Sequence, residues 1–247
     1  MPDLKDYIFY QDDWATIYCG DCLEIMPLME PESVDLVVTS PQYNLGNNHH
    51  TDNYRHKPYD DEIPEKEYQD LQIHILEEIY KILKSEGSFF YNHKNRFKNG
   101  IMLTPYQWIL KTKFIMKQEI VWNNGSPCFD KIRFAPFTER IYWMAKQPST
   151  VLFNCCLFID DWHISPVGTS EDHKRQYPEE IPRRIIISNP KADLILDPFL
   201  GSGTTCVAAK NLNRKSIGIE INPKYCEIAV KRLRQEVFDF RKDNENK

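Results

Sequence analysis

The chain has 247 residues, of which 41% are hydrophobic and 27% charged, with a formal net charge of −5 at pH 7. This composition is typical of a soluble globular protein and argues against a fibrous or disordered chain. The longest nearly apolar run, Val151–Ile159, is too short to span a bilayer, and the acidic N-terminus lacks the apolar core of a signal peptide. We therefore expect a cytoplasmic protein with a single domain over 1–247 and a frayed tail over 241–247.

Cysteines and charges exclude some function classes. The seven cysteines are an odd number and are scattered, so they do not suggest a disulfide framework. Cys19 and Cys22 form a C-x-x-C, but no second pair or histidine cluster completes a zinc site. We expect buried thiols and no metal. The negative net charge provides no global attraction to nucleic acid, although local basic clusters can still contact phosphates.

The first part of the chain alternates strands and helices. A short strand, Thr16–Cys19, runs into a helical segment that ends near Met29, and the β-rich run Val34–Thr39 predicts a central strand. Residues Leu45–Pro64 are polar and predict a long loop, which is usually functional or disordered at this length.

The middle of the chain continues the alternation. Apolar residues at helical spacing predict an amphipathic helix over Glu65–Lys84. The later expected elements are a strand over Gly87–Tyr91, a helix over Ile101–Lys111, strands over Phe114–Trp122 and Arg140–Ala145, and a helix opened by Pro178 and Pro182 that ends near Ser188.

The C-terminal part contains a unit typical of nucleoside binding. Leu194–Leu196 predicts a buried strand, and the glycines that follow Asp197 allow a tight turn with backbone N–H groups open to a ligand. A helix over Thr204–Asn213 and a strand over Lys215–Ile221 complete a βαβ unit, in which Glu220 can accept both ribose hydroxyls. A dinucleotide site needs a third glycine where this chain has Cys206. We therefore predict a nucleoside cofactor.

The alternating elements predict an α/β fold with a largely parallel sheet. Ligands of such sheets bind at the carboxyl ends of the strands, so the motifs at Ser40–Tyr43 and Asp197–Thr204 are expected at the same edge.

The Ser40–Tyr43 motif suits one difficult reaction. The exocyclic amine of adenine or cytosine is a poor nucleophile because its lone pair is delocalised into the ring. Ser40 Oγ and the Pro41 carbonyl can accept its two N–H bonds and aim the lone pair at a methyl donor, while Tyr43 can stack on a base that has left the helix.

Four motifs resemble those of the DNA amino-methyltransferases. TSPQYNLG is similar to the TSPPYN form of that family's catalytic motif, and DPFLGSGTT to its cofactor motif. HKRQYPEEIPRRII resembles the segment that holds the methionine end, and GIEINPKYCEIAVKRL the ribose-binding strand and its helix. The catalytic motif comes first, which is the order of the circularly permuted β class. The resemblance implies a Rossmann-like methyltransferase fold and S-adenosylmethionine as cofactor, with S-adenosylhomocysteine as product.

The resemblance also assigns the site residues. Ser40, Pro41, Gln42 and Tyr43 would form the catalytic loop. The implied cofactor-binding residues are Asp21, Cys22, Thr39, His173, Pro178, Asp197, Phe199, Gly201, Ser202, Gly203, Thr204, Glu220 and Ile221. For Asp21, a helix N-cap is the alternative role. Gln42 departs from the family, which usually has proline at this position. Either the absence of proline gives the loop more freedom, or the Gln42 amide adds a hydrogen bond to the base.

The substrate implied is double-stranded DNA. Serine at the first motif position goes mostly with cytosine N4 in the family, so we favour N4-cytosine over N6-adenine. The residues expected to contact nucleic acid are Asn44, Arg96, Lys98, Lys174 and Arg175, with 45–64 and 147–172 as candidate recognition segments. A homodimer, a cognate restriction endonuclease, RNA or protein as acceptor, and a catalytically silent binding protein remain open.

Overall fold

The computed structural model describes residues 2–45, 62–125, 133–154, 157–166 and 178–235. His173, Lys174 and Arg175 lie outside the described residues, as do most of the predicted loop at 45–64, part of the candidate segment at 147–172 and the tail at 241–247.

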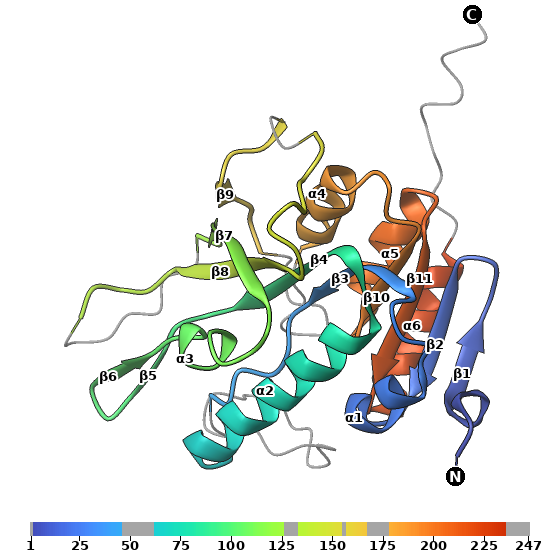
Figure 1. The fold of residues 1–247 in the computed structure, drawn as a ribbon, viewed down its shortest axis with the longest axis horizontal. Coiled ribbons are helices and arrows are strands. Elements are labelled where there is room, and N and C mark those ends of the chain that lie inside the picture. Colours follow the sequence, from blue (N-terminus) through green and yellow to red (C-terminus); the bar gives the residue numbers. More distant parts are fainter. Residues whose placement is uncertain (1, 46–61, 126–132, 155–156, 167–177, 236–247) are drawn as a thin grey trace, which may run out of the picture.

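Nine strands form one sheet across the molecule (Figure 1). They are β1 (Ile8–Gln11), β2 (Ala15–Cys19), β3 (Val34–Thr39), β4 (Leu83–His93), β7 (Ile115–Asn123), β8 (Thr138–Ala145), β9 (Asp161–His163), β10 (Leu194–Asp197) and β11 (Lys215–Glu220). Their order is β1-β2-β11-β10-β3-β4-β8-β7-β9. The run from β2 to β4 is parallel, β1 and β8 are antiparallel to their neighbours, and β9 is parallel to β7. The predicted α/β class with a largely parallel sheet is confirmed.

Helices cover both faces of this sheet (Figure 1). One face carries α1 (Cys22–Ile25), the short 3-10 turn η2 (Met26–Leu28), α2 (Glu65–Ile82) and α3 (Tyr106–Ile109); the other carries α4 (Glu180–Ser188), α5 (Thr204–Asn211) and α6 (Pro223–Arg234). Side chains alternate between the faces because the strand period is two: Val37 and Phe89 pack toward α2, whereas Leu36 and Phe90 pack toward α4 and α5. None of the described helices is long and apolar enough to cross a membrane.

Strands from the N-terminal and C-terminal parts of the chain pair with one another inside the sheet. Strand β10 pairs with β3 through Ile195 and Leu36, and β11 pairs with β2 through Glu220 and Cys19. The late βαβ unit is therefore inserted between strands from the beginning of the chain. Thr39, Asp197 and Glu220 are the last residues of β3, β10 and β11. Because these strands are parallel, the three residues lie at the same edge of the sheet.

The helix expected over Ile101–Lys111 is only partly present. Asn99 and Gly100 have φ values of 53° and 77° and form the tight turn of a hairpin between β5 (Arg96–Lys98) and β6 (Ile101–Leu103). An Asn-Gly pair favours this type of turn, since both residues tolerate positive φ. The helix begins only after Pro105, as α3.

Part of the candidate recognition segment at 147–172 belongs to the sheet. Asp161–His163 forms β9, and Trp162 is buried against the core on the α4 side. Across the described residues, no group of three or more His, Cys, Asp or Glu side chains is arranged to hold a metal ion.

Candidate active site

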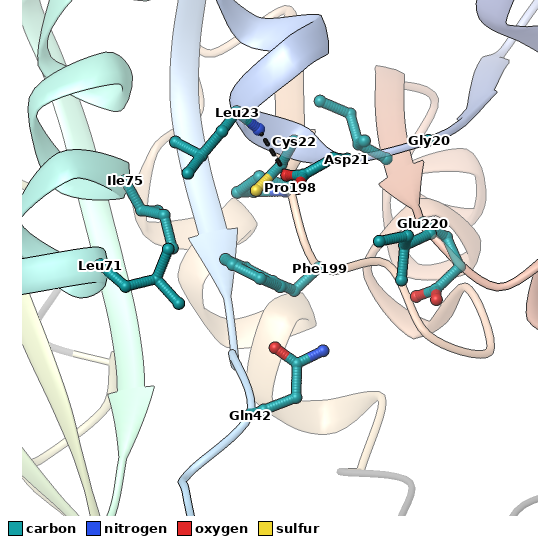
Figure 2. A pocket seen from close by; sticks show the side chains of 12 residues that line it. Gly20, Asp21, Cys22, Leu23, Gln42, Leu71, Ile75, Pro198, Phe199 and Glu220 are labelled. Atoms are coloured by element: carbon teal, nitrogen blue, oxygen red, sulfur yellow. Dashed lines mark hydrogen bonds between the residues drawn. The ribbon is translucent and has the colours of Figure 1, made fainter. Parts of the chain in front are cut away.

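A pocket lies at the carboxyl ends of β2, β10 and β11 (Figure 2). Leu71 and Ile75 reach into it from α2 on one side and Glu220 lies on the opposite side, with Phe199 between them. The lining residues are Gly20, Asp21, Cys22, Leu23, Gln42, Leu71, Ile75, Pro198, Phe199, Ile219, Glu220 and Ile221. Apolar walls with two carboxylates suit a nucleoside, whose base needs an apolar slot and whose ribose needs acceptors.

Glu220 is presented to this pocket by backbone hydrogen bonds. Its Oε2 accepts from the Gly201 N–H at 2.8 Å and its Oε1 from the Asn222 N–H at 2.9 Å. The side chain is largely buried, and this burial raises the pKa of the carboxyl above its ordinary value. Each carboxylate oxygen retains a lone pair, so Glu220 can still accept two ribose hydroxyls.

The N–H groups of Gly201 and Gly203 are bonded within the protein. The Gly201 N–H is donated to Glu220, and the Gly203 N–H to the Leu200 carbonyl at 3.0 Å. Gly203 has φ 87°, and a Cβ there would lie 2.8 Å from the Cβ of Ala229. The expectation that these two N–H groups are open to a ligand is therefore wrong: Gly201 holds the carboxylate and Gly203 lets α6 approach.

Asp21 and Cys22 border the pocket as predicted. Asp21 Oδ1 accepts from the Leu23 N–H at 2.9 Å and caps α1, while the side chain also lines the pocket, so both of the weighed roles fit its position. Cys22 is buried, and burial raises the pKa of its thiol, which therefore stays neutral. Cys19, Cys22, Cys206 and Cys226 are all free.

Thr39 and Asp197 contact each other and are not among the lining residues of the pocket, so their contact with the cofactor stays a prediction. The Thr39 hydroxyl donates to Asp197 Oδ1 at 2.7 Å, the Thr205 hydroxyl donates to Oδ2 at 2.6 Å, and the Phe199 N–H donates to Oδ1 at 3.1 Å. Asp197 is 0% exposed, and burial raises its pKa to about 6. The Asp197 carboxylate therefore connects, through hydrogen bonds, the end of β3 with the start of the glycine turn.

Ser202 and Thr204 also face the protein interior. Arg232 on α6 donates from Nη1 to both hydroxyls at 3.0 Å, and to the Ser202 carbonyl at 2.8 Å. The role of Ser202 and Thr204 in lining the methionine and adenosyl groups stays a prediction. Pro178 is buried ahead of α4 and is not among the lining residues of the pocket.

The catalytic loop lies beside the pocket. Gln42 lines it with its side chain pointing toward Phe199 (Figure 2), and its backbone carbonyl accepts from the Tyr68 hydroxyl of α2 at 2.7 Å. Pro41 is buried. The structure thus brings the early SPQY motif and the late glycine turn together, as their placement at strand ends predicts.

Ser40 and Tyr43 belong to a hydrogen-bond network that the sequence did not indicate. Ser40 Oγ lies 2.8 Å from the Tyr43 hydroxyl, which donates to Glu139 Oε2 at 2.9 Å. Asn92 Nδ2 donates to the Tyr43 oxygen at 2.8 Å and lies 3.2 Å from both Ser40 Oγ and Glu139 Oε2. The Tyr43 ring packs on His93 with centroids 4.5 Å apart.

Sequence reasoning missed Asn92 and Glu139, and only Asn92 could have been found from a sequence signal. Asn92 lies near the carboxyl end of β4, the strand beside β3, so its place at the sheet edge follows the rule that located Ser40. Glu139 is the second residue of an antiparallel strand, β8, whose register sets Arg140 opposite His93. Nothing local in the sequence marks Glu139 as a neighbour of Tyr43.

Two of the residues expected to contact nucleic acid, Arg96 and Asn44, have hydrogen-bond partners within the protein. Arg96 is buried, and Glu65 accepts two hydrogen bonds of 2.8 Å from its guanidinium, which also packs on Tyr68. Asn44 has φ 52° and exchanges two hydrogen bonds of 3.0 Å with the Ile63 backbone, so it joins the ends of the intervening segment. Lys98 is exposed, and its phosphate contact stays a prediction.

A family model described as DNA methylase matches residues 34–231, from β3 to α6. The chain belongs to the DNA methylase family. This match covers both the SPQY loop and the cofactor unit. As a member, the protein is an S-adenosylmethionine-dependent DNA amino-methyltransferase.

Curated relatives of this DNA methylase extend along most of its length. It is 28% identical to the Type II methyltransferase M.ScaI of Streptomyces caespitosus, over 96% of this chain and 88% of the relative. It is 30% identical to the Type II methyltransferase M.HinfI of Haemophilus influenzae, over 89% and 68%. It is 29% identical to the DNA adenine methyltransferase YhdJ of Escherichia coli K12, over 91% and 84%.

Solved structures share the fold of this DNA methylase. The PvuII DNA methyltransferase, described as cytosine-N4-specific, superposes with a TM-score of 0.77 at 22% identity, over 97% of this chain and 93% of the other. The M1.HpyAVI–SAM complex superposes with a TM-score of 0.63 at 25% identity, over 90% and 100%.

Proposed function

We propose that this DNA methylase methylates N4 of a cytosine that has left the double helix. The observation that supports this is the position of the catalytic loop: Ser40 and Pro41 directly precede Gln42, whose side chain lines the pocket that also contains Phe199 and Glu220. An amine held by the loop would therefore lie next to a methyl donor in the pocket.

The lining of the pocket fits the adenosyl group of S-adenosylmethionine. Leu71, Ile75 and Phe199 provide apolar surface for a purine, and Glu220 keeps acceptor capacity for the ribose hydroxyls. Asp21 adds a second carboxylate to the lining of the pocket. When bound, the cofactor supplies an electrophilic methyl group. The solved M1.HpyAVI–SAM complex shows that a protein of this fold binds it.

The protein contributes orientation and hydrogen-bond acceptors. Ser40 Oγ and the Pro41 carbonyl accept the two N–H bonds of the target amine, which favours a tetrahedral nitrogen with an available lone pair. Hydrogen bonds hold the Tyr43 hydroxyl in place, so its ring is a fixed surface on which the base can stack. No general base contacts the nitrogen directly in this scheme.

Cytosine is favoured over adenine because Ser40 supplies a hydroxyl where a carboxylate is the stronger acceptor. The PvuII neighbour is described as cytosine-N4-specific, whereas the relative YhdJ is a DNA adenine methyltransferase. Adenine N6 is therefore the alternative product. The order of the motifs along the chain, catalytic before cofactor, supports a circularly permuted methyltransferase.

One experiment identifies the product. Mixed genomic DNA is incubated with the enzyme and S-adenosylmethionine, digested to nucleosides and analysed by mass spectrometry. We expect N4-methylcytosine, and N6-methyladenine would refute the base assignment. RNA and protein are offered as acceptors in parallel reactions, and methylation of these alone would refute DNA as the substrate. Ser40→Ala should lower turnover and leave cofactor affinity nearly unchanged, since Ser40 does not line the cofactor pocket.

A further inference from the structure

The network around Tyr43 has a defined direction of hydrogen bonding. A carboxylate only accepts, so Tyr43 must donate its single hydroxyl proton to Glu139, and the Asn92 atom 3.2 Å from Glu139 Oε2 must be the amide nitrogen. With the Tyr43 proton committed, the 2.8 Å contact between Ser40 Oγ and Tyr43 requires Ser40 to donate.

This direction determines what Ser40 can offer a substrate. Its hydroxyl proton points to Tyr43, and one lone pair faces Asn92 Nδ2 at 3.2 Å. A second lone pair remains, and it can accept an N–H but cannot donate to a carbonyl oxygen. Ser40 is thus held as an acceptor by a carboxylate that it does not touch.

We propose that Glu139 positions Ser40 through Tyr43 and finally receives the proton that the methylated amine must lose. We call Ser40, Tyr43 and Glu139 the hydroxyl relay. This inference rests on the proposed function, because it assumes an exocyclic amine at Ser40.

The proton balance of the relay is complete. The amine nitrogen forms a bond to the methyl carbon as the carbon–sulfur bond of the donor breaks, and the nitrogen becomes positively charged. It passes a proton to Ser40 Oγ, the former Ser40 proton moves to the Tyr43 oxygen, and the former Tyr43 proton moves to Glu139. Glu139 becomes a neutral acid and returns the proton to water, to which it is partly exposed.

The surroundings suit this role. Burial raises the pKa of Tyr43, within the relay, well above its ordinary value. Burial also lowers the pKa of His93, beside the relay, to about 3, so both side chains stay neutral. Among the described charged groups, the Lys94 ammonium lies 5.9 Å from the Tyr43 ring centroid, and the Arg140 guanidinium is paired with Glu119 at 2.7 Å. Arg140 Nη1 also donates to the Glu139 carbonyl at 3.1 Å.

The neighbouring strand offers a matched control. Glu119 on β7 accepts from the Tyr106 hydroxyl at 2.6 Å, which is the same type of tyrosine–carboxylate bond in the same sheet. Neither residue lines the pocket or contacts Ser40. Substitution of Glu119 therefore tests for the general effect of losing such a bond.

The first experiment measures single-turnover methyl transfer. In Glu139→Gln an oxygen remains to accept from Tyr43, but the side chain cannot take up a proton at neutral pH. We expect its rate to fall by about 100-fold, as for loss of a proton acceptor, with KM for DNA and cofactor affinity unchanged. Glu119→Gln should keep the wild-type rate. Glu139→Gln at the wild-type rate would overturn the proton-accepting role.

The second experiment needs no turnover and tests the order of the hydroxyls. Wild type and Glu139→Ala are titrated with two duplexes that carry cytosine or uracil at the modified position (adenine or hypoxanthine if adenine is the product). Wild type should bind the cytosine duplex more tightly than the uracil duplex, because Ser40 cannot donate to the uracil carbonyl. In Glu139→Ala the Ser40 proton is free to donate, so the ratio of cytosine-duplex affinity to uracil-duplex affinity should shrink on the order of tenfold. Comparing both proteins on the same duplexes cancels the effect of the mismatch.

The outcomes separate this inference from the proposed function. If wild type methylates no exocyclic amine, the proposed function fails. If wild type methylates such an amine and the Glu139 variants equal wild type in rate and in base discrimination, only the relay fails. Thermal unfolding and cofactor affinity establish that a variant is folded. If Glu139→Ala does not fold, Tyr43→Phe removes the same bonds and should shrink the ratio equally; an unchanged ratio would overturn the ordering.

Discussion

Asp197 gives a quantitative test of the contact between the catalytic strand and the glycine turn. Its carboxyl is 0% exposed, and burial raises its native pKa from 3.8 to about 6. A shift of about two units corresponds to about 3 kcal/mol between the protonated and ionised forms. Because the group is fully buried, solvent does not screen this difference.

The sign follows from proton binding. Between about pH 4 and pH 6 the native state holds a proton on Asp197 that the unfolded state has lost, so the free energy of unfolding falls as pH rises. This contribution is full below the unfolded pKa and is lost by the time pH exceeds the native pKa. In Asp197→Asn the amide does not titrate. The variant should therefore be less stable than wild type at low pH. The gap, which is the difference in free energy of unfolding between the two proteins, should narrow by about 3 kcal/mol by pH 7.

Urea unfolding followed by tryptophan fluorescence, at several pH values between about 4 and 7, measures this gap directly. The difference between the two proteins cancels the titration of the other carboxylates. A gap that stays constant with pH, or one that widens toward pH 7, would refute the argument. Either result would mean that Asp197 is ionised without cost beside Thr39 and Thr205.

Four further substitutions test other parts of the structure. Glu220→Gln should weaken cofactor binding on the order of tenfold by calorimetry, because a charge-assisted acceptor is lost; unchanged affinity would contradict the ribose assignment. Gly203→Ala should lower the free energy of unfolding by about 3 kcal/mol, from positive φ and a clash with α6; a stable variant would show that α6 can move. Arg96→Ala should cost about 1.5–3 kcal/mol of stability, since Glu65 loses two charge-assisted hydrogen bonds. Lys98→Ala should leave stability unchanged and reduce the salt dependence of DNA binding. Equal effects of these two changes on DNA binding would restore the phosphate role of Arg96.

Local patterns predicted the elements that build the pocket. The strand over Val34–Thr39, the amphipathic helix from Glu65 and the βαβ unit that ends at Glu220 agree with the structure within a few residues. Strand runs and glycine turns are short-range signals, so a single sequence contains them. The Asn99-Gly100 pair is a hairpin-turn signal, but the sequence-based prediction was a helix after it and no hairpin.

Charge was a poor guide to contact. Arg96 looked like a phosphate ligand because it stands in a basic cluster, yet Glu65 from α2 neutralises it in the interior. Thr39 and Asp197 belong to different motifs and bind each other. Such pairings depend on how the helices and strands pack, and residues far apart in the chain provide both partners.

The sequence by itself determined the α/β class, the edge of the sheet at which chemistry occurs and the residue types available there, because strand ends and turns depend on neighbours along the chain. Only the tertiary structure decided which polar side chains face the pocket and which face one another. Glu139 reaches Tyr43 because β8 runs antiparallel to β4 and begins at the edge where β3 ends. Hydrogen bonds of this kind require distances near 3 Å, which are set by the packing of the whole sheet and not by any local pattern.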